Sequence, residues 1–299
     1  MGISATEAAF EGFRVVRRKP LTLVFWALFY FVTLAIAFGV AGATIANLMA
    51  FSKELEQGGT PTLEDLAPLG QAYAALLGLL LPLGLLSGAV LNTAVVRSVL
   101  RPEQSAFGYL RLGMDEVRVL VVSLALSIAF GFGILASAFA LGIIAGLAST
   151  AGAGVGILVG VVGGLAIVCA AIWLGIRFSL AVPITVAERR MAFATSFKVT
   201  KGHFWSLLGM AVIAFVMTMV VSLLGSLVVL PLQMAAGNIE DLAAYEGQAL
   251  VAILQAAWPM ILGWIVIQSV ISALQLAVIY APFSAAYRDL AGQGQEPVA

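Results

Sequence analysis

Long apolar stretches dominate this sequence of 299 residues, and short polar segments separate them. Each stretch is long enough to cross the hydrocarbon core of a bilayer as a helix, which takes about 20 residues. None shows the alternation of polar and apolar residues that a membrane-spanning strand needs. We therefore predict an all-α integral membrane protein with six transmembrane helices. The six stretches are residues 21–50, 69–96, 117–148, 155–173, 204–234 and 249–281.

Charged residues are scarce and unevenly placed. They make up 10% of the chain, whereas soluble proteins carry roughly 25%. The connections that would lie on one side of the membrane hold fourteen basic and eight acidic residues, and those on the other side hold Lys53 and seven acids. Basic residues concentrate on the cytoplasmic side of membrane proteins. We therefore predict that both termini are cytoplasmic.

A polar phrase occurs twice, as "TLEDLAPLGQA" from Thr62 and as "NIEDLAAYEGQA" from Asn238. Each begins with a residue that caps helices and places an acid three residues later, where it complements the helix dipole. Each then leads into an apolar stretch with an internal proline, Pro82 or Pro259, at which we expect a kink. The second and sixth spans therefore resemble copies of one another.

The cytoplasmic segments also share a pattern. In residues 9–20, 106–117 and 194–205, an aromatic residue or leucine is followed by a basic and an aliphatic residue. We expect each to form a short amphipathic helix at the membrane surface. The sequence thus predicts one polytopic domain, residues 1–299, built from three quasi-repeated hairpins, each preceded by a cytoplasmic interfacial helix. The units are residues 1–101, 102–183 and 184–290, with a short tail, 291–299.

Residues 176–205, "IRFSLAVPITVAERRMAFATSFKVTKGHFW", carry a resemblance to a known family. The matching features are Arg177, Pro183, Ser196 with Lys198, Lys201-Gly202 and Phe204-Trp205. This pattern resembles the membrane domain found beside some bacterial glycerophosphodiester phosphodiesterases and the related YciC-like inner-membrane proteins. The resemblance implies a bacterial inner-membrane location and a link to lipids. The soluble phosphodiesterase barrel is missing, so no catalytic residue carries over.

Three basic residues form the candidate ligand site. Arg177 lies near the inner end of the fourth span, and Lys198 and Lys201 lie in the following cytoplasmic segment. A guanidinium binds phosphate in a bidentate manner, so we expect the three bases to converge on a lipid phosphate, with Phe204 and Trp205 beside the acyl chains. The alternative is that Arg177 only extends its charge to the headgroup layer.

Glycines recur on the fourth span. Gly156, Gly160 and Gly164 are spaced by four and fall on one helix face, which allows another helix to approach closely. Gly142 and Gly146 of the third span are candidates for the facing surface. We expect this packing within the chain, and packing against a second copy remains open.

Few polar residues lie within the spans. Gln268, Ser272 and Gln275 share one face of the sixth span, and Asn92 occupies the second. Such residues form hydrogen bonds between helices. The alternative is a polar lining for a lipid headgroup or a solute.

Several kinds of chemistry find no support in the sequence. Cys169 is the only cysteine and His203 the only histidine, and no acid lies deep in a span. We expect no enzyme activity, metal, cofactor or nucleic-acid partner. The favoured function is a non-enzymatic protein that binds, moves or senses phospholipid. A membrane scaffold or subunit, associated with another membrane protein or with itself, and a passive channel or transporter for a small solute remain as alternatives.

Overall fold

The computed structural model describes residues 4–57, 63–103, 106–235 and 250–293. Those ranges are helical and contain no strand, which confirms the predicted all-α fold. Within them, six helices are long and apolar enough to cross a membrane, as predicted. They are α3 (Pro20–Gln57), α4 (Leu63–Leu100), α5 (Met114–Ser149), α6 (Ala153–Phe178), α9 (Phe204–Ala235) and α11 (Leu250–Gln293).

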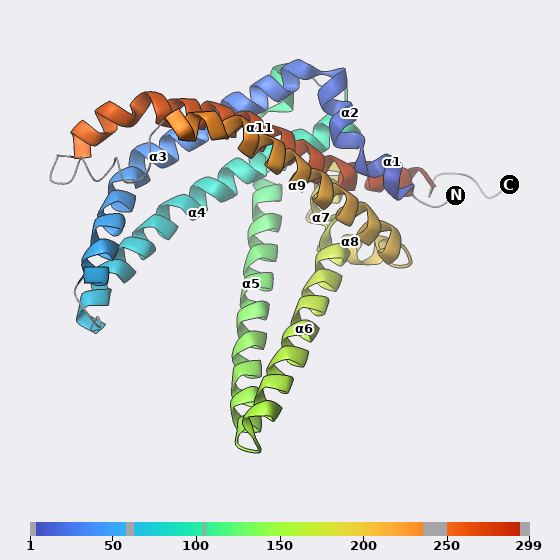
Figure 1. Cartoon of the computed structure of the whole chain (residues 1–299). Helices are drawn as coiled ribbons and strands as arrows, with labels where there is room; N and C mark the ends of the chain where they lie inside the picture. The colour runs from blue at the N-terminus through green and yellow to red at the C-terminus, as the bar shows by residue number, and fades with distance from the viewer. Residues whose placement is uncertain (1–3, 58–62, 104–105, 236–249, 294–299) are drawn as a thin grey trace.

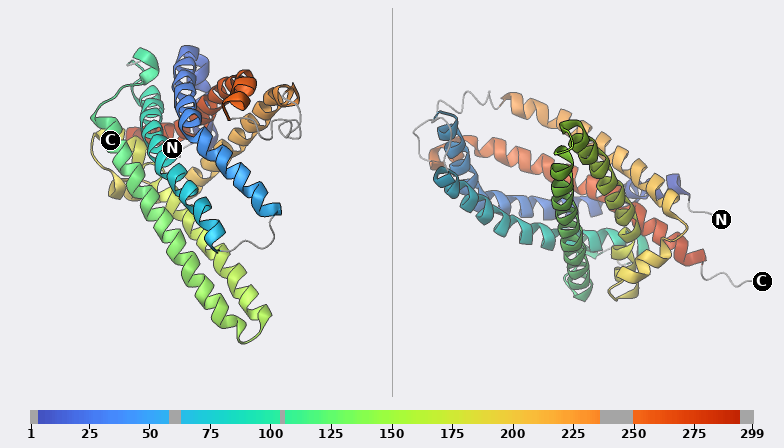
Figure 2. Two further views of the ribbon diagram at one scale, coloured as in Figure 1. Left: turned by 90° about the vertical axis from the view of Figure 1, so that its left-hand side faces the viewer. Right: turned by 90° about the horizontal axis from the view of Figure 1, so that it is seen from below.

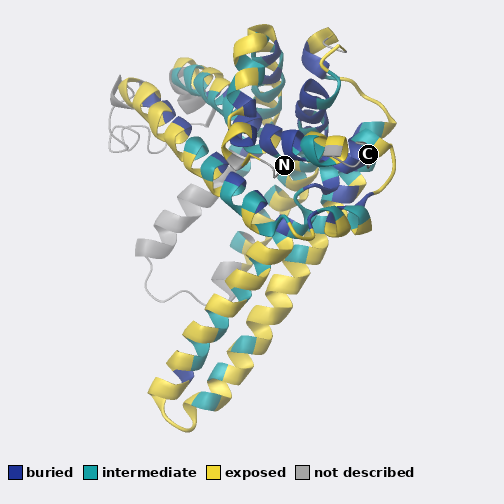
Figure 3. Cartoon of the chain, turned by 90° about the vertical axis from the view of Figure 1, so that its right-hand side faces the viewer, coloured by how far each residue is buried: buried dark blue, intermediate teal, exposed yellow. Residues whose placement is uncertain are grey.

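Four of the long helices form a bundle, and two form a separate arm. Helix α11 packs along α3 and α9 and also contacts α4. Helices α5 and α6 pack mainly on one another and project away from the bundle in another direction (Figures 1 and 2). Burial follows this division, because buried residues gather in the bundle and at the base of the arm, while the arm itself is largely exposed (Figure 3). The core includes Trp26, Leu91, Leu207, Met210 and Ala277.

Local chemistry explains several helix boundaries. Pro20 opens α3, a position where its missing N–H costs nothing. Gly152, between α5 and α6, has a φ of 143°, which only glycine adopts readily, and this permits the tight turn at the tip of the arm. Helices α4 and α11 continue through Pro82 and Pro259. Helix α11 also extends to Gln293, beyond the residue 290 boundary predicted for the start of the tail.

The segment before the first span packs on the bundle. It forms α1 (Ala5–Ala9) and α2 (Glu11–Arg18), and these pack against α9 and α11. A Cβ atom on Gly12 would lie 2.7 Å from Val278 Cα, so α2 touches the α11 backbone. Glu11 is buried and pairs with Arg14 and Arg288.

The two later connecting segments differ from the first and from each other. The expected amphipathic helix over residues 106–117 is wrong: the chain forms the short 3-10 turn η1 (Ala106–Tyr109), in which residues 107–109 have positive φ values, then a non-helical stretch, and α5 begins at Met114. A Cβ on Gly108 would lie 2.7 Å from Phe25 Cβ, and Trp26 Nε1 donates a hydrogen bond to the Gly108 carbonyl. Before α9 there are two short helices, α7 (Ala181–Glu188) and α8 (Phe193–Val199). The predicted outer caps, Thr62 and Asn238, lie outside the described residues.

Candidate functional site

Helix α8 is joined to the C-terminal end of α6 by a buried hydroxyl group. Ser196 Oγ donates to the Arg177 carbonyl at 2.9 Å, and Thr200 Oγ1 lies 3.3 Å from the same carbonyl but closer, at 2.9 Å, to the carbonyl of Ser196. The last carbonyls of a helix lack partners within the helix, so Ser196 completes the end of α6. The two side chains are four residues apart, which places them on the same face of α8.

The Arg177 side chain lies against two aromatic rings that also contact each other at this junction. The guanidinium carbon is 5.4 Å from the centre of the Trp173 ring and 5.1 Å from that of Phe197. Trp173 is four residues before Arg177 on α6, so helical geometry brings the two together. Phe197 arrives from α8, and its ring meets the Trp173 ring edge to face at 5.8 Å. Cation–π contacts of this kind hold the guanidinium in place.

The guanidinium has hydrogen-bond donors without partners. Arg177 Nε and Nη1 are both buried, and neither bonds to any residue that the structure describes. A buried charged donor without an acceptor is costly, and native proteins rarely leave one. Aromatic faces attract the positive charge but do not replace directed acceptors. The arrangement is therefore suited to an anionic ligand with several acceptor oxygens, such as a phosphate.

The two lysines do not join Arg177 in this structure. Lys198 and Lys201 are exposed, and no recorded contact links either side chain to the guanidinium. The reason for Lys198 is helical geometry: Ser196 faces α6, and two residues later the side chain points to the other side of α8. The predicted convergence of three bases is therefore not present among these contacts.

The aromatic residues at the site also differ from those predicted. Phe204 and Trp205 meet edge to face, with ring centres 5.3 Å apart, and Trp205 is highly exposed. The rings that contact Arg177 are Trp173 and Phe197. The contact between Trp173 and Arg177 was predictable, because residues four apart lie on the same face of a helix. The contribution of Phe197 was not, because it depends on how α8 docks.

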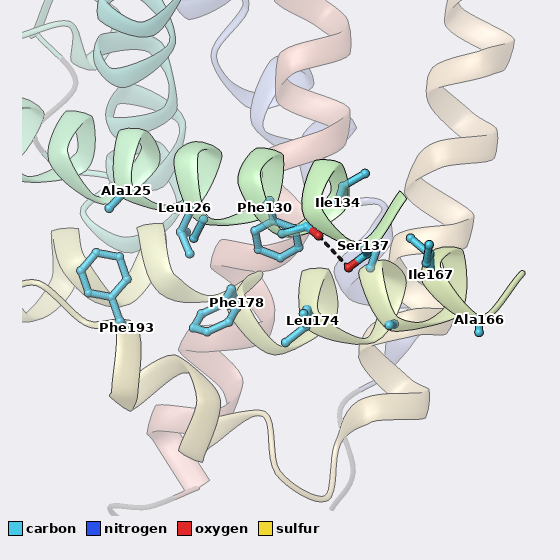
Figure 4. A pocket seen from close by; sticks show the side chains of 14 residues that line it. Ala125, Leu126, Phe130, Ile134, Ser137, Ala166, Ile167, Leu174, Phe178 and Phe193 are labelled. Atoms are coloured by element: carbon cyan, nitrogen blue, oxygen red, sulfur yellow. Dashed lines mark hydrogen bonds between the residues drawn. The ribbon is translucent and has the colours of Figure 1, made fainter. Parts of the chain in front are cut away.

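An apolar groove lies beside this junction, between α5 and α6 (Figure 4). Its volume is about 620 Å³. Phe193 of α8 and Phe178 of α6 lie toward one end, and Ala166 lies toward the other (Figure 4). Phe178 lines the groove and also packs against Phe197, with ring centres 5.8 Å apart. One aromatic ring thus connects the groove to the residue that covers Arg177.

The glycine prediction needs correction. Gly156 packs closely on α5, since a Cβ there would lie 2.8 Å from Ser149 Cβ. Gly160 and Gly164 have nothing within 4 Å outside their own helix, so their predicted contact within the chain is wrong. The second close position is Gly163, where a Cβ would meet Leu141. The two close positions are therefore seven residues apart, which is about two turns of the helix.

The facing surface on α5 also differs from the one expected. Gly142 and Gly146 have open space around them. The atoms that approach α6 belong to Leu141, Ala145 and Ser149, which are spaced by four. This spacing places them on a face adjacent to, and distinct from, the one that carries the two glycines.

The polar residues of the spans make separate contacts. Gln275 Nε2 donates to Ser222 Oγ of α9 at 2.6 Å, which is a hydrogen bond between helices. Gln268 Nε2 donates to Ser272 Oγ within α11 at 3.4 Å. Asn92 Oδ1 is buried and accepts no hydrogen bond from any described residue. No recorded contact brings Asn92 to the other three.

A buried ion cluster where α4 meets α5 was missed by the sequence reasoning. Arg97 donates to Glu116 Oε1 and lies 3.3 Å from Asp115 Oδ2. Arg118 and Arg101 also approach Asp115, at 3.0 and 3.9 Å. Glu116 further accepts a bond from the Gly113 N–H, in the manner of a helix cap. The acids in the first turn of α5 were a visible signal for capping, but not for burial with Arg97.

The fold defines a class, a polytopic helical membrane protein, and where α6 meets α8 two donors of Arg177 lack acceptors among the described residues. The family model described as a domain of unknown function, DUF7847, matches residues 4–290, so the chain belongs to that family. No curated protein matches the chain, and no solved structure does. The family match does not bear on the resemblance of residues 176–205 to the YciC-like proteins, which stays a prediction.

Proposed function

We propose that this protein is a non-enzymatic multi-pass membrane protein that binds a phospholipid, with the lipid phosphate at Arg177. The observation that carries the proposal is the partly buried Arg177 guanidinium, which lies against Trp173 and Phe197 and whose buried Nε and Nη1 lack acceptors among the described residues. A phosphate offers the acceptor oxygens and the negative charge that this group lacks.

The orientation of the chain supports this placement. The bias of basic residues puts both termini and the inner ends of α4 and α6 on the cytoplasmic side. Arg177 then lies at the level of the inner-leaflet headgroups, where anionic lipids attract basic residues. The resemblance of residues 176–205 to bacterial inner-membrane proteins is in keeping with this location. The quasi-repeat of three hairpins is part of the same proposal, although the three cytoplasmic segments differ in local structure.

A second candidate function is that of a scaffold or subunit in a membrane complex. The observation in its favour is the exposed arm, where Gly160 and Gly164 have open space around them. Small residues allow close packing between membrane helices. In this case the protein would co-purify with another membrane protein or with a second copy, and Arg177 would serve only as an anchor.

Native mass spectrometry of the protein in mild detergent tests the first proposal. We expect phosphatidylglycerol to remain bound to the wild type and to be lost from Arg177→Ala. Arg111→Ala is the matched control, because Arg111 is an exposed base on the same side of the molecule. Arg177→Lys should bind less lipid than the wild type, since an ammonium keeps the charge but lacks the planar fork of donors.

The controls separate binding from folding. Circular dichroism and gel filtration should show the same helical content and size for all four proteins. Equal retention of phosphatidylglycerol by the wild type and Arg177→Ala would refute the proposal. A stoichiometric second protein in the wild-type spectrum, with no retained lipid, would favour the scaffold instead.

A further inference from the structure

The groove between α5 and α6 has an apolar lining along its length. Its walls are built from small and aliphatic side chains, with the aromatic residues near its inner end (Figure 4). Its only hydroxyl belongs to Ser137, which donates to the Gly133 carbonyl of its own helix at 2.7 Å. The groove therefore offers no side-chain charge to a polar solute and favours a hydrocarbon occupant.

The length of the groove suits one leaflet of a bilayer. Phe178 and Ala166 mark its two ends on α6 and are twelve residues apart. At about 1.5 Å per residue this is roughly 18 Å. The hydrocarbon core of a bilayer is about 30 Å thick, so each leaflet contributes roughly 15 Å. The groove is thus long enough to contact most of an acyl chain that starts at the inner surface of the membrane.

The inner end of the groove leads to Arg177 through two rings. Phe130 of α5 meets Phe178 edge to face at 6.3 Å, and Phe178 in turn packs on Phe197. Phe197 covers the guanidinium. Phe178 borders the groove and packs on the ring that contacts the guanidinium, so the apolar groove and the cationic group are neighbours. An amphipathic ligand with an anionic head and a hydrocarbon tail suits such a pair of neighbouring sites.

From this continuity we infer that the groove holds one acyl chain of the phospholipid whose phosphate lies at Arg177. The inference rests on the proposed function and adds to it a tail site on the arm. The chain fills space between α5 and α6 and shields the Phe130 and Phe178 rings. The occupant is a lipid of the inner leaflet, because the cationic end of the groove is the inner one.

A photo-crosslinking experiment tests the tail site. The probe is phosphatidylglycerol with a diazirine in one acyl chain, presented to the protein in phosphatidylcholine nanodiscs. We expect adducts to concentrate in residues 125–137 and 166–178. Ala170→Phe places a ring in the groove, and Ala129→Phe does so from the opposite wall. Either change should remove most of these adducts, because the added ring fills the space that the acyl chain would occupy.

Ala138→Phe is the matched control, since Ala138 is an exposed residue of α5 outside the groove lining. It should leave the adduct yield unchanged. Adducts spread evenly over all spans, and insensitive to both groove variants, would overturn the tail site. If Arg177→Ala still lost phosphatidylglycerol in that case, the proposed function would stand alone. Groove adducts that survive Arg177→Ala at full yield would overturn the link between head and tail.

Discussion

Two arginines lie at equivalent places, near the C-terminal ends of α4 and α6, and have opposite surroundings. Arg97 is buried against Glu116 and Asp115, which neutralise its charge within the chain. Arg177 lies against two aromatic rings and has two buried donors without acceptors among the described residues. The same type of side chain therefore forms structural ion pairs at Arg97 and leaves unsatisfied donors at Arg177, where α6 meets α8. A charged side chain becomes a candidate for ligand binding when its neighbours do not supply acceptors for its hydrogen-bond donors.

The sharpest test of this contrast is the stability of the two methionine variants. Arg97→Met leaves the buried Glu116 and Asp115 without their main partner, which typically costs about 3–5 kcal/mol. Arg177→Met removes donors that are already unpaired, so in lipid-free detergent its free energy of unfolding should change by less than about 1 kcal/mol. Thermal unfolding followed by circular dichroism measures both. Equal losses would show that the two arginines serve the same structural role.

Added lipid should affect the two regions differently. At phosphatidylglycerol concentrations about one hundred times Kd, binding should stabilise the wild type by about 2.7 kcal/mol. Arg177→Ala should gain much less, because its binding group is missing. Phosphatidylcholine serves as the comparison lipid. A rise in Tm of the same size in the Arg177→Ala variant would contradict a site at Arg177.

Glycine substitutions extend the contrast to packing. Gly12→Val forces a side chain against the α11 backbone, and overpacking typically costs about 1–3 kcal/mol. Gly160→Val on the arm meets open space within the chain, so the expected change is within about 0.5 kcal/mol. Tm in detergent distinguishes the two. A large loss at Gly160 would instead indicate a second chain packed on the arm.

The smallest effect is expected at the rim of the bundle. Arg288 is partly exposed and lies 3.4 Å from Glu11, which Arg14 also contacts. Removing one of two bases should cost only about 0.2–1 kcal/mol in Arg288→Ala. High salt should reduce the difference between variant and wild type. A loss comparable to that of Arg97→Met would place Arg288 among the buried structural charges.

The spans were predictable because the bilayer requirement acts on each one separately. Residues 21–50, for example, lie wholly within α3, and no knowledge of neighbours was needed. The turn at Gly108 was not predictable, because its positive φ depends on contact with Phe25 and Trp26. The docking of Gly12 on α11 was missed for the same reason. Such features arise from pairs of residues that are distant in sequence.

The residues of the candidate site also fall into those that local sequence predicted and those that depend on contacts between distant segments. Arg177 was identified from its type and its place near the end of a span, and Trp173 followed from helical spacing. Phe197, and not Lys198, contacts Arg177 because of the face that α8 turns toward α6. That face is set by Ser196 at the Arg177 carbonyl. Hydrogen bonds to a backbone carbonyl leave no mark in a hydropathy pattern.

The docking of α2 on α11 also has a consequence for biosynthesis. Glu11 leaves the ribosome before its partner Arg288, which is 277 positions later. At about 5–20 residues per second, the chain between them takes roughly 15–60 seconds to synthesise. Throughout that time the surface of α2 that will meet Ala277 and Val278 has no α11 to cover it. The docking of α2 on α11 must therefore wait until α11 has been synthesised.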